Sequence, residues 1–288
     1  MRRLSALLST ALLLVTGALA GAAGASAKAP AEAAPPVTGH GDPVLVRDIE
    51  IPVPGQPAVR AYLVRPQRPG SGLAGVLNLH WFEPGRASQD RTEFLAEATA
   101  LAGRGVVSLL PQLTFPWAGD PVGDARDRAT VTAQLDAVQR AYRRLLAEPG
   151  VVPTRTAVVG HDYGAMYAAG LAAREPGLRT AVLLAPDATW ANWFDLYWLQ
   201  LPEGEKAAYR KVFAGLDPVD LVGRLGSGAY LQFAEADRFV GAQTRAAFSA
   251  AAPEARVSLY PGEEHDLGAT RVRDDRLAWL AGRLGLRG

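Results

Sequence analysis

Residues 156–165 read TAVVGHDYGA, and this stretch decides the fold of the 288-residue chain. An apolar run typical of a buried strand ends at Gly160, and small residues typical of a helix that packs closely on a sheet begin near Gly164. A strand-to-helix turn this sharp forces the central residue, Asp162, into a strained backbone conformation that the flanking glycines make possible. We therefore expect the Asp162 side chain at the carboxyl edge of a sheet, above a helix N-terminus. The alternative is a structural turn in which Asp162 only caps the helix.

Short apolar runs recur along the chain on both sides of this turn. They are typical of strands buried on both faces of a parallel sheet. The runs lie at residues 75–79, 106–110, 156–159, 180–184, 230–234 and 257–260. Segments with helical spacing of apolar or small residues separate most of them, at residues 88–101, 127–146, 164–174 and 272–284. This alternation predicts an α/β fold with a doubly wound, mostly parallel sheet and right-handed crossovers.

Three segments precede these strands. Residues 1–27 begin with a positive charge, continue as an apolar run and end in small residues, which predicts a secretory signal peptide; a transmembrane anchor is the alternative. Residues 28–42 are rich in alanine and proline and predict a flexible leader. Residues 44–53 and 59–64 alternate around a Pro-Gly turn, which predicts an antiparallel hairpin at a sheet edge. We expect a secreted protein with one α/β domain over residues 43–288.

Residues 188–228 are rich in aromatic side chains and lie between two predicted strands. They include Trp190, Trp193, Trp198, Phe194, Tyr197 and Tyr209. The segment predicts a short lid insertion over the strand ends. The alternative is that these aromatic side chains only pack the insertion onto the domain.

Charge and cysteine content exclude several classes of protein. The chain has 30 basic and 29 acidic residues, and loss of the signal would leave 28 basic against 29 acidic. So balanced a chain has no electrostatic basis for binding nucleic acid or an anionic membrane surface. It has no cysteine, which excludes disulfides and thiolate chemistry. No dinucleotide fingerprint or spaced metal-ligand set occurs, so we expect a small-molecule substrate, no cofactor and no metal.

Three motifs, in order, resemble the α/β-hydrolase superfamily over nearly the whole chain after Val44. The first is LNLHWFEPG at residues 77–85, which is similar to the loop that gives one backbone amide to the oxyanion hole in that superfamily. Here Trp81 follows His80, where glycine is usual. The second motif is the Gly-x-Asp-x-Gly turn, which is similar to the nucleophile elbow. The resemblance implies the α/β-hydrolase fold.

The third motif is a late acid followed by a late histidine, which is their order in that superfamily. Asp237 follows the apolar run that ends at Ala234, and His265 follows the run that ends at Tyr260. Their contexts, AEADRFV and YPGEEH, resemble the dienelactone hydrolases especially. The resemblance implies a triad of Asp162, His265 and Asp237, with Glu235 and Asp220 as alternatives for the last.

The elbow holds Asp162 where most α/β-hydrolases hold serine. Its sequence, GHDYG, resembles the elbow of epoxide hydrolases and haloalkane dehalogenases, in which aspartate is the nucleophile. A carboxylate is a poor catalyst of ester hydrolysis because the acyl-enzyme would be an anhydride, but it suits attack at saturated carbon. The product would be an alkyl ester of Asp162, which water activated by His265 then hydrolyses.

We expect the side chains of these motifs to line one pocket under the aromatic segment, because ligands of open α/β sheets bind at the carboxyl ends of the strands. The predicted oxyanion and substrate-binding residues are Trp81, Tyr163, His80, His161, Trp193 and Tyr197. The backbone amides of Trp81 and Tyr163 are expected to stabilise the oxyanion. Tyr197 and Tyr209 are candidates for polarising an epoxide oxygen, and a tryptophan for holding a halide.

The sequence thus predicts a secreted hydrolase with an Asp-His-Asp triad that acts on a small or medium apolar substrate of the epoxide or haloalkane type. Two alternatives stay open. One is an esterase or lactonase similar to dienelactone hydrolases, in which Asp162 acts as a base or an electrostatic group. The other is a non-catalytic, hydrolase-like binding protein.

Overall fold

The computed structural model describes residues 43–68, 70–82, 90–114 and 120–286. The predicted signal peptide and leader lie outside these ranges, so both stay predictions. The last three residues of the predicted oxyanion loop, 83–85, also lie outside them.

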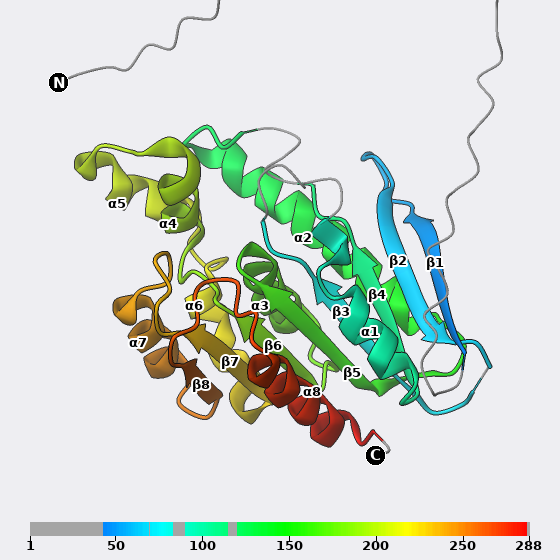
Figure 1. Ribbon diagram of the computed structural model, residues 1–288. Helices are drawn as coiled ribbons and strands as arrows, with labels where there is room; N and C mark the ends of the chain where they lie inside the picture. The colour runs from blue at the N-terminus through cyan, green and yellow to red at the C-terminus, as the bar shows by residue number, and fades with distance from the viewer. Residues whose placement is uncertain (1–42, 69, 83–89, 115–119, 287–288) are drawn as a thin grey trace, which may run out of the picture. The chain divides into compact units, whose positions relative to one another are not determined.

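A single mixed sheet forms the centre of the described part of the chain (Figure 1). Its strands are β1 (Val44–Ile51), β2 (Val59–Pro66), β3 (Leu73–Leu79), β4 (Val106–Pro111), β5 (Val151–His161), β6 (Thr180–Leu184), β7 (Ala229–Ala234) and β8 (Arg256–Tyr260). They lie in the order β1-β2-β4-β3-β5-β6-β7-β8. The pairs β1/β2 and β2/β4 are antiparallel, and the other neighbouring pairs are parallel. The predicted edge hairpin and the mostly parallel sheet are therefore confirmed.

The predicted apolar runs form the buried strands, because helices cover both faces of the sheet there. Every residue of β3, β4, β6 and β7 is buried. β8 differs because it is an edge strand, where Val257 and Leu259 are exposed. β5 begins earlier than the apolar run, with a partly exposed extension over residues 151–155.

Helices pack on both faces of the sheet. Those outside the predicted lid are α1 (Leu95–Ala102), α2 (Ala125–Leu146), α3 (Tyr163–Arg174), α7 (Ala242–Ala251) and α8 (Thr270–Leu284). α1 and α8 cover the face that is toward the viewer in Figure 1, and α2 and α3 cover the other face. The guanidinium of Arg276 on α8 binds the Glu97 carboxylate on α1. No helix of the described residues is both long enough and apolar enough to cross a membrane.

The aromatic segment folds into short helices beyond the carboxyl end of β6. They are α4 (Trp190–Phe194), a π-helical turn (Asp195–Leu199), α5 (Glu203–Val212), α6 (Pro218–Leu221) and a 3₁₀ stretch (Val222–Gly228). Side chains of α2 hold this segment in place. Asp127 accepts a 2.5 Å hydrogen bond from the Tyr209 hydroxyl, and Arg128 donates to the carbonyls of Val212 and Ala214. The prediction that Tyr209 polarises a substrate was therefore wrong, because its hydroxyl serves to anchor α5 to α2.

Candidate active site

Asp162 occupies the sharp turn between β5 and α3, with φ 51° and ψ −122°. A non-glycine residue with positive φ costs of the order of 1–3 kcal/mol, so the surrounding structure has to impose this conformation. Part of that constraint is the hydrogen bond from the Asp162 amide to the Leu184 carbonyl at 2.8 Å. The flanking glycines are needed for space. A Cβ atom at Gly160 would lie 2.4 Å from the Gly164 carbonyl oxygen, and one at Gly164 would lie 2.3 Å from that of Leu79.

The structure brings Asp162, His265 and Asp237 together although they lie on three separate loops. The Nδ1 atom of His265 is 2.8 Å from Oδ2 of Asp237, which is a normal hydrogen bond. Its Nε2 atom is 3.5 Å from Oδ1 of Asp162, the distance of an ion pair rather than of a short hydrogen bond. Asp237 also accepts hydrogen bonds from the backbone amides of Phe239 and Val240, which fix its orientation.

The two carboxylates control the charge of His265. Burial lowers the pKa of His265, but the neighbouring Asp162 and Asp237 carboxylates outweigh this effect and raise the pKa to about 10. Burial alone would likewise raise the pKa of Asp237, but the hydrogen bond from His265 holds that pKa below its ordinary value. At neutral pH the group is therefore an imidazolium between two carboxylates.

Two further groups bind the Asp162 carboxylate. The indole Nε1–H of Trp193 donates to Oδ1 at 2.8 Å, and the backbone amide of Phe82 lies 3.4 Å from Oδ2. This amide differs from the predicted one. The amide of Trp81 donates instead to Oε2 of Glu93 at 2.7 Å. Because successive amides of an extended loop point in different directions, only one of the two can face Asp162.

His161 packs against the loop that carries Trp81 and Phe82, and both of its ring nitrogens have hydrogen-bond partners. Nδ1 is 2.7 Å from Oε1 of Glu93, and Nε2 is 2.9 Å from the backbone oxygen of His265. The imidazole also stacks on the Trp81 indole, with ring centroids 5.1 Å apart. Sequence reasoning did not identify Glu93, since nothing local distinguishes it from other carboxylates near a helix start.

His80 is buried away from the pocket and supports the loop that carries Trp81. Its Nδ1 atom donates to the Trp81 carbonyl at 2.7 Å, and its Nε2 atom accepts the backbone amide of Leu113 at 2.9 Å. Burial lowers the pKa of His80 to about 4, so the ring is neutral at physiological pH. His80 therefore stabilises the loop that carries Trp81. It does not make the predicted contact with substrate.

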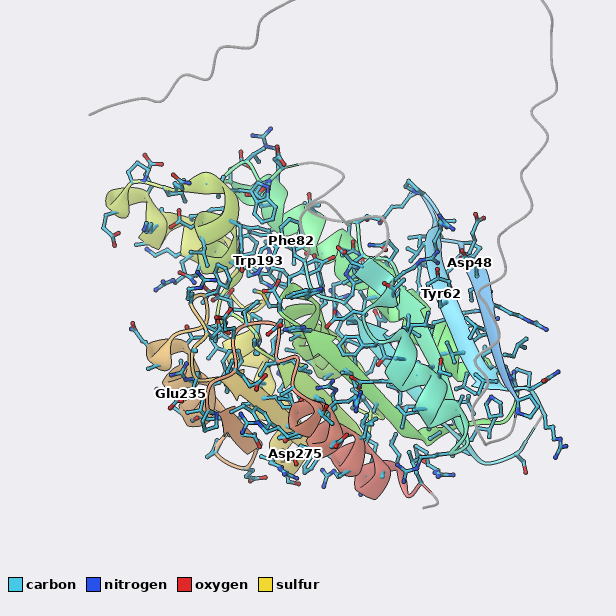
Figure 2. The ribbon with its side chains drawn as sticks, in the orientation of Figure 1. Asp48, Tyr62, Phe82, Trp193, Glu235 and Asp275 are labelled. Atoms are coloured by element: carbon cyan, nitrogen blue, oxygen red, sulfur yellow. The ribbon has the colours of Figure 1, made fainter. Side chains whose placement is uncertain are left out.

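Aromatic side chains cover Asp162. Figure 2 shows Phe82 and Trp193 together beyond the end of the sheet, and their rings meet edge to face at 6.0 Å. The Trp193 indole also stacks on the buried ring of Tyr163, 5.4 Å away. As a result Asp162 is only 2 % exposed.

A pocket of about 340 Å³ opens beside His265. Its lining residues are Trp81, Phe82, Tyr197, Ala236, Arg238, Phe239, Glu264, His265 and Asp266. The predicted single pocket is therefore only partly present, since Trp81, Tyr197 and His265 line it but Asp162, His161 and Trp193 do not. The reason is that Asp162 is buried, with the Phe82 backbone amide and the Trp193 indole lying against its carboxylate.

The structure also separates the candidate acids. The side chain of Asp237 is 1 % exposed and bonded to His265, whereas Glu235 and Asp220 are exposed at the surface. Figure 2 shows Glu235 near α7, away from Phe82 and Trp193. Within the described residues, no group of three or more histidine, aspartate or glutamate side chains is arranged to hold a metal ion.

Comparison with solved structures identifies the fold. The chain is similar to α/β hydrolase GrgF from a Penicillium species, at 14 % identity, with a TM-score of 0.59 over 84 % of this chain and 99 % of that one. It is similar to a protein assigned as a dienelactone hydrolase from Klebsiella pneumoniae, at 18 % identity, with a TM-score of 0.56 over 84 % of this chain and 98 % of that one.

The likeness extends to parts of larger proteins. Dipeptidyl peptidase 4 from Porphyromonas gingivalis matches at 17 % identity with a TM-score of 0.59, over 84 % of this chain but only 36 % of the peptidase. No protein-family model and no curated protein matches the sequence. The predicted α/β-hydrolase fold is confirmed, and the likeness to a dienelactone hydrolase with it.

Proposed function

Because the chain has the α/β-hydrolase fold with a carboxylate at its elbow, we propose that it is a hydrolase in which Asp162 attacks a saturated, electrophilic carbon. One observation carries the proposal: the Asp162 carboxylate lies 3.5 Å from His265 Nε2, while Asp237 holds the other ring nitrogen. A nucleophile paired with a base that a third group orients is the arrangement of covalent hydrolytic catalysis. The Phe82 amide near Oδ2 supplies a donor for a developing oxyanion.

The protonation state of His265 favours epoxides over haloalkanes. In the first step Oδ1 of Asp162 forms a bond to a ring carbon, and the carbon–oxygen bond of the epoxide breaks. The leaving alkoxide needs a proton, and the His265 imidazolium carries one at neutral pH. A halide leaves without a proton. With a haloalkane, His265 would therefore have to release its proton to solvent before it could activate water for the second step.

The second step regenerates the enzyme. Once Asp162 is an uncharged ester, one of the two carboxylates that keep His265 protonated is lost, so the neutral imidazole left by the first step persists. Neutral His265 takes a proton from water, which attacks the ester carbonyl, and the charge that forms on Oδ2 faces the Phe82 amide. Collapse expels the product as an alkoxide, which takes this proton back from His265, and the new Asp162 carboxyl group then gives its own proton to His265. Asp162 is restored and a diol is released.

The substrate is proposed to enter through the pocket beside His265. Its walls are largely aromatic, with Trp81, Phe82 and Phe239 among them, which suits a small or medium apolar molecule. The Tyr197 hydroxyl, whose pKa burial raises far above the ordinary value, stays protonated and can hydrogen-bond the ring oxygen. Because Asp162 is buried, the reacting carbon reaches it only when the side chains that cover it move.

An esterase or lactonase is the second candidate, because His265 lines the pocket and Asp162 does not. In that case an ester would react in the pocket with water activated by His265, and Asp162 would act only as an electrostatic group. The raised pKa of His265 argues against this candidate, since an imidazolium cannot accept a proton.

A substrate screen separates these functions. Purified protein is tested against styrene oxide, 1,2-dibromoethane, short p-nitrophenyl esters and small lactones, beside Asp162→Ala and Asp162→Ser. We expect epoxide opening that Asp162→Ala abolishes. Ester or lactone turnover that survives in Asp162→Ala would overturn the proposal in favour of the second candidate. Turnover of none of these would contradict the proposed function and favour a hydrolase-like binding protein.

We further propose that the protein is exported and that the mature chain begins near Lys28. Support comes from the order of charged, apolar and small residues over positions 1–27. Intact-mass measurement of protein from the medium tests this. Recovery of the full-length chain in the membrane fraction would contradict it.

A further inference from the structure

Glu93 joins two loops of the candidate site. One carboxylate oxygen accepts the Trp81 backbone amide at 2.7 Å, and the other lies 2.7 Å from Nδ1 of His161. The glutamate sits between a 3₁₀ turn (Asp90–Thr92) and α1. It therefore fixes the loop that presents the Phe82 amide relative to the residue that directly precedes Asp162.

His161 extends this link to a third loop. Its Nε2 atom is 2.9 Å from the backbone oxygen of His265, and its side chain is 2 % exposed. Glu93, His161 and the His265 backbone thus form one continuous chain of hydrogen bonds. This chain connects the loop before Phe82, the elbow and the loop that carries His265.

The chain of hydrogen bonds dictates where protons lie. A backbone carbonyl only accepts, so His161 Nε2 must carry a proton. An ionised Glu93 also only accepts, so His161 Nδ1 must carry one too. Both contacts are therefore made together either by an imidazolium beside an ionised Glu93 or by a neutral His161 whose Nδ1 accepts the proton of a protonated Glu93. A neutral His161 beside an ionised Glu93 has to give up one of the two.

We propose that Glu93 and His161 are positioning residues that, through this chain of hydrogen bonds, hold the His265 loop and the Phe82 amide in place relative to Asp162. This inference rests on the proposed function, because the positions of the His265 loop and the Phe82 amide matter for a reaction at Asp162. Neither residue lines the pocket beside His265. Both act through the main chain of the groups that they hold.

The surroundings of His161 are compatible with a cation. The His265 ring lies 5.7 Å away, and its charge is offset by Asp162 and Asp237 on either side. The Trp81 indole stacks on the His161 ring at an interplanar angle of 9°, a geometry that favours a positive charge over an aromatic face. Among the described residues that contact the ring, Glu93 is the acid that pairs with it directly.

Two substitutions of Glu93 separate a positioning role from a packing role. In Glu93→Gln the amide oxygen can accept the Trp81 amide, and the NH₂ group can donate to a neutral His161 Nδ1. The hydrogen bonds from the Trp81 amide to residue 93, from residue 93 to His161, and from His161 to the His265 carbonyl then all persist with a neutral His161. In Glu93→Ala both contacts of residue 93 are lost. Glu235→Ala, which removes an exposed carboxylate, is the matched control.

Histidine-selective ¹⁵N NMR tests the proposal without any substrate. In the unmodified protein we expect a proton on His161 Nε2, which donates to the His265 carbonyl. In Glu93→Gln we expect neutral His161 with its proton on Nε2, and His265 signals that stay in place. In Glu93→Ala the His265 signals should shift. An unprotonated His161 Nε2 in the unmodified protein, or His265 signals that do not respond to Glu93→Ala, would overturn the proposal.

Kinetics on the substrate found by the screen supply the second arm. In Glu93→Ala the His265 loop and the Phe82 amide should shift relative to Asp162. This should lower kcat about 10- to 100-fold with little change in KM. Glu93→Gln should keep most of the activity, because its side chain can make the same hydrogen bonds. Equal losses in the two variants would contradict a positioning role. If the unmodified protein has no turnover, the proposed function fails while the NMR arm still decides the proton arrangement.

Discussion

The Nε2 atom of His265 lies 3.5 Å from Oδ1 of Asp162, and its Nδ1 atom lies 2.8 Å from Oδ2 of Asp237. A histidine held between two buried carboxylates keeps its proton well above the pH at which a free histidine loses it. The resting site therefore has a cationic His265 beside the Asp162 side chain. This pair couples the stability of the fold to pH and determines the order of proton transfers.

The first prediction concerns stability. The pKa of His265 is raised from 6.5 to about 10 in the folded state. Protonation of His265 therefore stabilises the folded state fully below pH 6.5, and this stabilisation is lost as pH rises toward 10. Relative to His265→Gln, the unfolding free energy should fall by up to about 1.4 kcal/mol for each pH unit in this window. Urea denaturation of both proteins between pH 6 and pH 10 measures it. A difference that is independent of pH would show that His265 is not protonated as described.

The second prediction concerns the covalent intermediate. His265→Gln removes the base of the second step, which should slow that step about 10²- to 10⁴-fold. With a bromoalkane, whose leaving group needs no proton, the alkyl ester should accumulate on Asp162 and be found by peptide mapping. Asp162→Ala/His265→Gln is the control and should stay unmodified. An adduct on another residue would show that the nucleophile is misassigned.

The third prediction concerns the hydrogen bond between Trp193 and Asp162. Trp193→Phe removes a donor to a buried carboxylate and should cost about 1.5–3 kcal/mol of stability beyond the lost packing. Trp190→Phe is the matched control, since this buried indole donates to a neutral carbonyl, that of Leu216 at 3.1 Å. Chemical denaturation compares the two. Equal losses would mean that the Trp193 bond to Asp162 contributes no more than a neutral one.

The fourth prediction concerns the turn itself. In Gly160→Ala and Gly164→Ala the new methyl group would lie within 2.4 Å of backbone atoms, so each should cost more than about 4 kcal/mol or prevent folding. Gly204→Ala adds a methyl group where no atom lies within 4 Å and should change stability by less than about 1 kcal/mol. Thermal melts of the three proteins check this. A stable Gly164→Ala protein would contradict the close approach of α3 to β3.

Sequence reasoning located the strands and the elbow because each follows from local chemistry. The apolar runs before Gly160 and over Thr180–Leu184 have a single stable placement, between covered faces of a sheet. The positive φ of Asp162 follows from the spacing of its two glycines. The pairing of Asp237 with His265 could be predicted only from the resemblance to known hydrolases, since 28 residues separate them.

Sequence reasoning missed whatever depended on the direction of one side chain or one amide. Phe82 and Trp81 are neighbours, and nothing in the sequence tells which amide faces Asp162. The link from Glu93 to His161 spans 68 residues and uses a glutamate with no distinguishing context. Tyr209 is aromatic like its neighbours, and only the position of Asp127 on α2 turns its hydroxyl away from the site.

Turnover in H₂¹⁸O tests the central claim most directly. If water attacks an ester of Asp162, its oxygen enters the Asp162 carboxyl group, and the product leaves with the oxygen that the enzyme supplied. Cleavage after Arg155 and Arg174 releases a peptide, residues 156–174, whose one acidic side chain is Asp162. After turnover of the epoxide and digestion in ordinary water, this peptide should be heavier by about 2 Da per exchanged oxygen. An unlabelled peptide together with ¹⁸O in the product of the first turnover would contradict nucleophilic attack by Asp162.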